Sequence, residues 1–435
     1  MSLVNSKESQ ISARRVFALA LPALGVLAAM PLYLLLDTAV VGRLGAEQLA
    51  ALGAAAAVQS VVTTQLTFLS YGTTARSSRL FGSGDKQGAI AEGVQATYVA
   101  LIVGFGLACV IWLFGGQIAL WMTGNPETAK LSASWLHVAA FAIPITLVEM
   151  AGNGWLRGIQ DTKKPLYFTL AGLIPGAIAV PFFVHWWGLV GSAWANVLGM
   201  GIIALLFVQE LLKQHTGSWR LRPQVIKRQL VLGRDLIIRS ASLQAAFLSA
   251  AAVAARFGTA PLAAHQVMLQ IWNFLTLVLD SLAIAAQTLI GSALGAKSVD
   301  VARNAGQKII RYSVIFSGAL AAVFALGAGI IPRIFTQDAA VLEAMRIPWW
   351  IMIGMIIAGG VLFAIDGVLL GAGDAAFLRT ITVGSVIVGF LPGIGIAYAA
   401  GLGLAGIWAG LAAFIGLRTI AVVIRFYSMR WAVID

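Results

Sequence analysis

Residues 16–41 read VFALALPALGVLAAMPLYLLLDTAVV, a run in which Asp37 is the single charged side chain. A helix of about 20 apolar residues is long enough to cross the hydrocarbon core of a bilayer. The run follows the basic residues Lys7, Arg14 and Arg15 and contains no small-residue processing site. We therefore expect a first membrane helix rather than a cleaved signal peptide.

The composition of the whole chain is that of a protein surrounded by lipid. Of its 435 residues, 60% are hydrophobic and 11% are charged, and the mean hydropathy is +0.90. A soluble domain has about 25% charged residues. Twelve apolar spans are predicted, near residues 14–41, 47–74, 88–114, 130–155, 163–184, 188–212, 231–256, 260–291, 303–328, 343–370, 376–399 and 403–427.

The basic residues predict the orientation of these spans. The chain has 29 Lys and Arg residues against 17 Asp and Glu residues. With both termini in the cytoplasm, all but a few of the basic residues fall in cytoplasmic loops, as the positive-inside rule requires. No basic run is interleaved with aromatic residues, so nucleic-acid binding is not expected. The single cysteine, Cys109, excludes a disulfide framework.

The two halves of the sequence repeat each other. The segment Arg43–Gly45 matches Arg256–Gly258, and Gly158–Asp161 matches Gly371–Asp374, in both cases at an offset of 213 residues. Because each half holds six spans, the copies have the same orientation and form a parallel repeat, which favours a transporter. The predicted fold is all-α, with twelve transmembrane helices in two pseudo-symmetric six-helix lobes, residues 1–214 and 231–435, joined by a cytoplasmic loop at 215–230.

Three motifs resemble the multidrug and toxic compound extrusion (MATE) family. Leu34–Gly45 (LLLDTAVVGRLG) resembles the motif of its first helix, and Gly154–Thr162 (GWLRGIQDT) resembles the signature after its fourth helix. Gly367–Asp374 (GVLLGAGD) is a weaker copy of that signature, and the segments around Arg239, Asp280 and Asp366 are similar to the DinF branch. The resemblance covers essentially the whole chain. It implies an antiporter that exports organic cations or other amphiphiles in exchange for protons or sodium.

Two departures from the family pattern bear on the coupling ion, and the second favours protons over sodium. Members with a second acid in the fifth helix would place it near Val180, where this chain has no acid. Sodium-coupled members that resemble NorM have a glutamate in the seventh helix and an aspartate in the tenth. Here the seventh span has no Glu, and Gly359 stands at the second position. Sodium coupling stays the alternative, and no metal site or organic cofactor is predicted.

Asp37 is the predicted proton-binding and substrate-binding residue. A carboxylate at the centre of the membrane costs about 2.5–3.5 kcal/mol and is a functional candidate by default. No basic residue lies within one helical turn of Asp37 in the sequence. Pro31, six residues earlier, removes a backbone hydrogen bond and is the predicted helix hinge. The alternative interpretation is that Asp37 makes only a packing hydrogen bond between helices.

Three charged residues in the second lobe predict an ion cluster. Asp280, Asp366 and Arg239 lie near the cytoplasmic ends of their spans and are expected to form a structural cluster or gate, with a cation site as the alternative. Asp235 is spaced for an i,i+4 pair with Arg239. In the first lobe, six residues are predicted to line a cavity, with interhelical or interfacial packing as the alternative for each: Tyr33, Gln59, Thr63, Asn153, Trp194 and Asn196.

Two functions remain open beside that of a channel, for which the sequence shows no obvious filter. The first is export of lipophilic organic cations or amphiphiles in exchange for protons, by a monomer in the cell membrane with both termini cytoplasmic. The second is a flippase for lipid-linked precursors, which the wider superfamily includes. Its cavity would need several basic residues to hold pyrophosphate, and Arg239 is the only one assigned within a span. An enzyme is not expected, because no Ser/His/Asp set, HExxH motif or catalytic carboxylate pair occurs at workable spacing.

Overall fold

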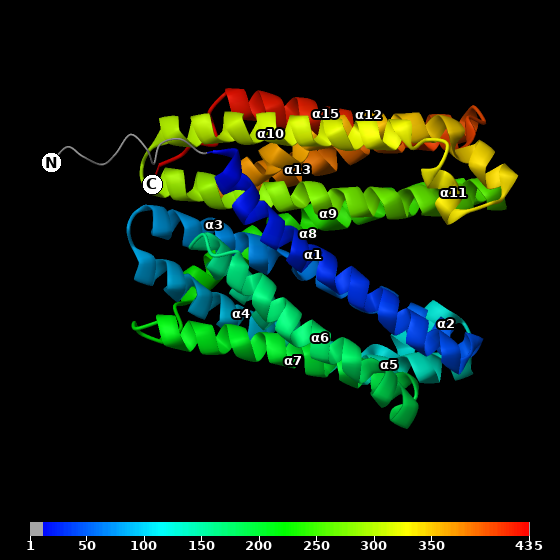
Figure 1. Cartoon of the computed structure of the whole chain (residues 1–435), viewed down its shortest axis with the longest axis horizontal. Coiled ribbons are helices and arrows are strands. Elements are labelled where there is room, and N and C mark those ends of the chain that lie inside the picture. Colours follow the sequence, from blue (N-terminus) through cyan, green and yellow to red (C-terminus); the bar gives the residue numbers. More distant parts are fainter. Residues whose placement is uncertain (1–11, 435) are drawn as a thin grey trace. The chain divides into compact units, whose positions relative to one another are not determined.

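The computed structural model describes residues 12–434. Within this range the chain is helical without strands, and twelve helical segments are long and apolar enough to cross a membrane, which confirms the predicted fold class (Figure 1). The elements are α1 (Ala13–Val41), η1 (Gly42–Leu44), α2 (Ala46–Leu66), α3 (Phe68–Gly82), α4 (Lys86–Thr123), α5 (Pro126–Gly158), α6 (Lys163–Trp187), α7 (Leu189–Gln214), α8 (Pro223–Arg256), α9 (Thr259–Gly295), α10 (Val299–Leu326), α11 (Ile331–Phe335), α12 (Ala339–Gly371), α13 (Ala375–Ser385), η2 (Val386–Phe390), α14 (Leu391–Ala399) and α15 (Gly403–Tyr427).

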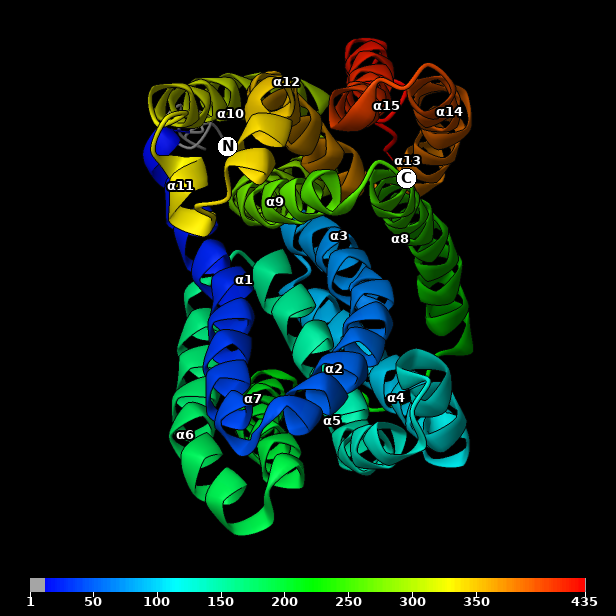
Figure 2. The same ribbon diagram turned by 90° about the vertical axis from the view of Figure 1, so that its right-hand side faces the viewer.

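These helices form two compact units. The N-terminal unit comprises residues 21–233, and the C-terminal unit comprises residues 12–20 and 234–434. In the N-terminal unit, α4 packs along α5 and α6 along α7, and α5 also contacts α2, α3 and α7 (Figures 1 and 2). In the C-terminal unit, α12 packs against α9, α10 and α15. The fourth span of each half, α5 or α12, is therefore the central helix of its unit.

The sequence repeat coincides with repeated backbone turns. Gly45 and Gly258 follow the first span of each half with φ angles of 121° and 120°. This conformation is open to glycine and strained for a residue with a Cβ atom. The second pair of matching segments also turns through positive φ, at 66° for Gln160 and 79° for Gly373. The two halves thus share local turn geometry as well as sequence.

The distribution of apolar side chains fits a lipid environment. Leu113, Trp121 and Leu326 are 77%, 78% and 88% exposed, whereas Trp155 and Trp408 fill the interiors of their units. Apolar side chains of this size on the outside of a helix bundle would contact acyl chains in a bilayer. The exposed and the buried faces are both apolar. Polarity alone therefore does not show which face of a helix packs against other helices and which faces lipid.

The connector between the halves is bound to the N-terminal unit. Gln95 on α4 donates from Nε2 to the Arg220 carbonyl at 2.9 Å and accepts at Oε1 from the Arg222 N–H at 2.7 Å. Helix α8 begins at Pro223, inside the segment 215–230 that was predicted as a loop. Proline is favoured in the first helical turn, where its missing N–H leaves no hydrogen bond unmade. Helix α8 is therefore shared between the two units.

Candidate functional site

Asp37 lies on α1 with its side chain buried in the N-terminal unit. Tyr33, one turn earlier, lies on the same helix face, and Tyr33 and Asp37 are only 4% and 2% exposed. The residues between them, 34–36, are all exposed. Because positions i and i+4 of a helix share one face, the spacing by itself aligns Tyr33 with Asp37.

One carboxylate oxygen of Asp37 is hydrogen-bonded and the other is not. Ser192 on α7 donates its hydroxyl to Asp37 Oδ2 at 2.7 Å, and Trp135 on α5 donates from Nε1 to the Ser192 hydroxyl oxygen at 3.2 Å. Asp37 Oδ1 is buried and has no hydrogen-bond partner among residues 12–434. No lysine, arginine or histidine in that range contacts the carboxylate. A buried carboxylate without a basic partner is costly, and a proton or a cation would compensate it.

Tyr33 and Asn196 complete this buried polar group. Asn196 lies on α7 one turn after Ser192, is 4% exposed and faces the Tyr33 hydroxyl. We call Tyr33, Asp37, Trp135, Ser192 and Asn196 the Asp37 cluster. Three of the five are predicted from the sequence, whereas Ser192 and Trp135 are not. The one signal in the sequence for Ser192 is its i,i+4 spacing from Asn196. A serine within an apolar span is too common to indicate a site by itself.

The other predicted cavity residues contact different neighbours. Thr63 donates its hydroxyl to the Gln59 carbonyl in the preceding turn of α2 at 3.0 Å. Gln59 also lines a small pocket among apolar residues of α2, α4 and α5. Asn153 donates from Nδ2 to a carboxylate oxygen of Glu149 at 3.4 Å, and Trp194 stacks on a phenylalanine of α5. For these residues a role in substrate binding stays a prediction.

Pro31 lies on the exposed side of α1, which continues past it to Val41. The helix contains a second proline, Pro22, so its hydrogen-bond ladder is interrupted twice. A bend at either proline is compatible with this pattern, and the hinge at Pro31 stays a prediction.

Asp366, a buried acid of the C-terminal unit, is bound by two arginines. Arg239 on α8 and Arg418 on α15 each donate from Nη2 to Asp366 Oδ2 on α12, at 2.5 and 2.7 Å. Asp366 and Arg418 are both 3% exposed. Asp280, the third residue of the predicted cluster, is half-buried on α9. We call Arg239, Asp366 and Arg418 the Asp366 cluster.

The position of Arg418 corrects the expectation that Arg239 is the only basic residue within a span. Helix α15 continues to Tyr427, and the Arg418 guanidinium lies over the Phe414 ring at 5.6 Å from its centroid. The apolar span predicted at 403–427 already contained position 418. The signal for Arg418 in the sequence is its position well inside this span, which argues against assigning it to the nearest loop.

Asp235 also differs from its predicted pairing. Its Oδ1 accepts from Arg379 Nη1 at 2.6 Å and from the adjacent Arg234 at 3.0 Å. Arg239, one turn further along α8, contacts Asp366 instead. The spacing of Asp235 and Arg239 permits a pair within the helix, but contacts with other helices decide the partners.

Comparison with known proteins assigns the family. The sequence profile of the MatE family matches residues 22–182 and 236–394, one stretch in each half of the chain. The chain belongs to the MatE family. This MatE protein is therefore a multi-pass membrane protein of the multidrug and toxic compound efflux transporters, as the motifs predicted.

Relatives of this MatE protein occur in plants and bacteria. Protein DETOXIFICATION 44, chloroplastic, of Arabidopsis thaliana is 30% identical over 93% of the chain and 80% of its own length. DNA damage-inducible protein F of Escherichia coli (strain K12) is 26% identical, covering 94% of the chain and 90% of that protein. A probable multidrug resistance protein NorM of Bradyrhizobium diazoefficiens is 26% identical, covering 86% and 84%.

Solved structures share the fold. An outward-facing multidrug resistance MATE family transporter of the MOP superfamily superposes with a TM-score of 0.85 at 20% identity over 96% of each chain. A MOP superfamily transporter from Pyrococcus furiosus, described as having a binding pocket of reverse polarity, also gives a TM-score of 0.85, at 21% identity over 96% of this chain and 95% of that one. At this level of identity the likeness concerns the fold alone.

Proposed function

We propose that this MatE protein exports lipophilic organic cations in exchange for protons, and that both bind in turn at Asp37. The observation that carries the proposal is the state of its carboxylate. It is buried on α1, has one oxygen free of hydrogen bonds and contacts no basic residue of the described chain. A permanent basic neighbour at this position would have argued against exchange, because it would compensate the charge at all times.

The exchange follows from competition for one charge. An ionised Asp37 attracts an organic cation from the cytoplasm or the inner leaflet. When the site opens to the other side, a proton neutralises the carboxylate and the cation loses its counter-charge. Each of the two ligands lowers the affinity for the other, which is the coupling that antiport requires. Moving one charge through a membrane potential of 100 mV is worth about 2.3 kcal/mol, enough to bias the cycle.

The tyrosine and the tryptophan of the Asp37 cluster suit a flat aromatic cation. Tyr33 lies on α1, the helix that carries Asp37, and Trp135 lies on α5 and donates to Ser192. Both contribute aromatic ring surface to the cluster. Aromatic faces attract cations within about 6 Å of the ring centroid. The proposed site thus combines one negative charge with apolar and aromatic surface, the usual make-up of a small-molecule site.

The orientation and the location belong to the same proposal. Both termini lie in the cytoplasm, as the distribution of basic residues predicts, and the protein acts as a monomer in the cell membrane. Sodium is the alternative coupling ion. Imposing a proton gradient and a sodium gradient separately on proteoliposomes, and following the efflux of a fluorescent organic cation, distinguishes the two. We expect efflux with the proton gradient, and efflux with the sodium gradient alone would overturn the choice of ion.

A second candidate function is favoured by Arg418. A flippase for lipid-linked precursors needs basic side chains for pyrophosphate, and Arg418 adds a buried arginine beside Arg239 in the C-terminal unit. Both arginines donate to Asp366, however, so part of their charge is compensated. Competition between an anionic polyprenyl lipid and a cationic dye for the purified protein tests this function. Displacement of the dye by the lipid would favour the flippase.

A further inference from the structure

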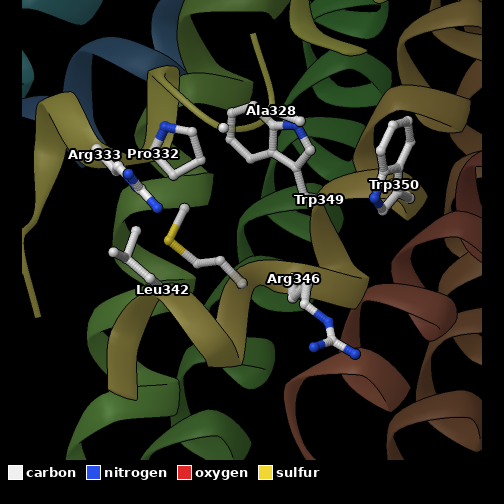
Figure 3. Close-up of a pocket in the computed structure, with 9 residues that line it drawn as sticks. Ala328, Pro332, Arg333, Leu342, Arg346, Trp349 and Trp350 are labelled. Carbon is white, nitrogen blue, oxygen red and sulfur yellow. The ribbon is translucent and has the colours of Figure 1, made fainter. Parts of the chain in front are cut away.

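A cavity outside both acid clusters lies at one end of the C-terminal unit. It has a volume of about 310 Å³ and is bordered by the segment after α10, by α11 and by α12 (Figure 3). This volume is at the lower end of the range of about 300–1,000 Å³ that is typical of small-molecule sites. The function proposed above does not involve this cavity.

The surroundings of the cavity place it at a membrane boundary. Helix α11 and the turn before it join two membrane spans. Leu326 at the end of α10, Ile330 in the turn, and Ile334 and Phe335 on α11 are all exposed. Trp350 at the edge of the cavity is exposed as well. Exposed apolar side chains together with tryptophan at the end of a span are typical of the layer where headgroups meet acyl chains.

The inner wall of the cavity is apolar and rigid. Trp349 is 2% exposed, donates from Nε1 to the Phe324 carbonyl at 3.2 Å and packs against the Phe324 ring. Pro332, Leu342 and Met345 line the cavity beside it. An apolar wall fixed in this way is suited to the glycerol and acyl region of a lipid rather than to a hydrated ion.

The polar rim of the cavity is positively charged. Its lining includes two arginines and no carboxylate. The Arg333 side chain is exposed, forms no ion pair with residues 12–434 and extends from the Pro332 side toward Leu342 (Figure 3). Arg346 points away from Arg333 and forms an exposed pair with Glu343 at 3.3 Å. The nearby Asp338 accepts hydrogen bonds from two backbone N–H groups at the start of α12.

We propose that this cavity binds one anionic phospholipid, with the phosphate on Arg333 and the glycerol region against Trp349. An arginine fork matches phosphate oxygens in charge and geometry. The two arginines disfavour an organic cation, so the cavity is distinct from the export site. The membrane boundary supplies the lipid at high local concentration, which a soluble anion lacks.

Native mass spectrometry of the purified full-length protein tests the proposal by titration with phosphatidylglycerol. We expect one retained lipid per protein, with phosphatidylcholine retained more weakly. Arg333→Gln should weaken phosphatidylglycerol binding about fivefold, the equivalent of about 1 kcal/mol per arginine at an anionic lipid surface. Leu342→Glu, which adds a carboxylate to the half-buried wall, should abolish retention.

Arg256→Gln is the matched control. Arg256 is an exposed arginine at the end of α8, two membrane crossings before the end of α10 and hence on the same side of the membrane. Its removal should leave binding unchanged. The proposal is overturned if Arg333→Gln binds as the wild type does, if Arg256→Gln weakens binding equally, or if inorganic phosphate displaces the lipid at equal concentration. The last result would identify a site for free phosphate.

Discussion

Asp37 and Asp366 are both acids buried within membrane helices, but their surroundings are opposite. Asp37 accepts one hydrogen bond from a neutral hydroxyl, and its second oxygen is unpartnered among residues 12–434. Asp366 accepts from two arginines on Oδ2, and its Oδ1 is likewise unpartnered among the described residues, so the arginine charges are what distinguish the two acids. The first acid is free to exchange ligands, whereas the second is bound by charges that belong to the protein.

This difference separates a ligand-exchange site from a structural ion cluster. A buried ion pair is worth little when compared with an apolar replacement of the same shape, but the loss of one partner leaves a buried charge without compensation. The Asp366 cluster should therefore matter for stability, and the Asp37 cluster for transport. The four predictions that follow test this division, beginning with the largest effect.

Replacement of Asp37 by asparagine should abolish proton-driven export and leave the protein folded. The amide keeps the shape of the side chain and a hydrogen bond with Ser192 but cannot bind a proton or attract a cation. Efflux of a fluorescent cation from proteoliposomes and thermal unfolding in detergent measure the two properties. Glu149→Gln is the control, because Glu149 is an acid of the same unit that is paired with Asn153. Full export by Asp37→Asn would refute the proposed role.

Replacement of Asp366 by asparagine should destabilise the protein by about 3–5 kcal/mol, because Arg239 and Arg418 would keep buried charges without a counter-ion. Chemical unfolding in mixed micelles measures this loss. The combined replacement of Arg239 by Met, Asp366 by Leu and Arg418 by Met removes all three charges and should restore stability close to that of the wild type. If this triple variant is stable but does not export, the cluster acts as a gate and is not only structural.

Replacement of Arg418 alone by methionine should cost about 1.5–3 kcal/mol, the value of a hydrogen bond to a charged group. The effect is smaller than for Asp366→Asn because Arg239 still compensates the carboxylate. Arg239→Met should cost less again, since the Arg239 side chain is 16% exposed against 4% for Arg418. Unfolding in mixed micelles compares the two variants, and the reverse order would contradict this account.

Replacement of Ser192 by alanine should lower the free energy of unfolding by about 1.5–3 kcal/mol, because the buried Asp37 carboxylate and the Trp135 N–H each lose a hydrogen-bond partner. Export should continue, since the exchangeable carboxylate remains. Trp135→Phe removes only the donor to Ser192 and should have a still smaller effect on unfolding. Loss of export in Ser192→Ala, comparable to that of Asp37→Asn, would make the hydroxyl part of the exchange.

Much of the molecule was predictable because it depends on local sequence. The spans follow from runs of apolar residues, and the repeated turns at Gly45 and Gly258 follow from matching tripeptides. Asp37 stood out because a charge within such a run is rare. Ser192, Trp135 and Arg418 did not stand out, because each is ordinary as a residue type, and only its neighbours in space give it a role.

The sequence by itself determined the number of spans, their duplication and the presence of an isolated acid in the first of them. These properties depend on the cost of placing polar groups in hydrocarbon, which acts on each segment separately. Tertiary structure alone decided which acid is compensated. Arg239 could reach Asp235 along its own helix, yet it pairs with Asp366 beside Arg418, while no arginine of the described chain reaches Asp37. The physical reason is that packing determines which side chains from distant helices come within the few ångströms over which an ion pair forms.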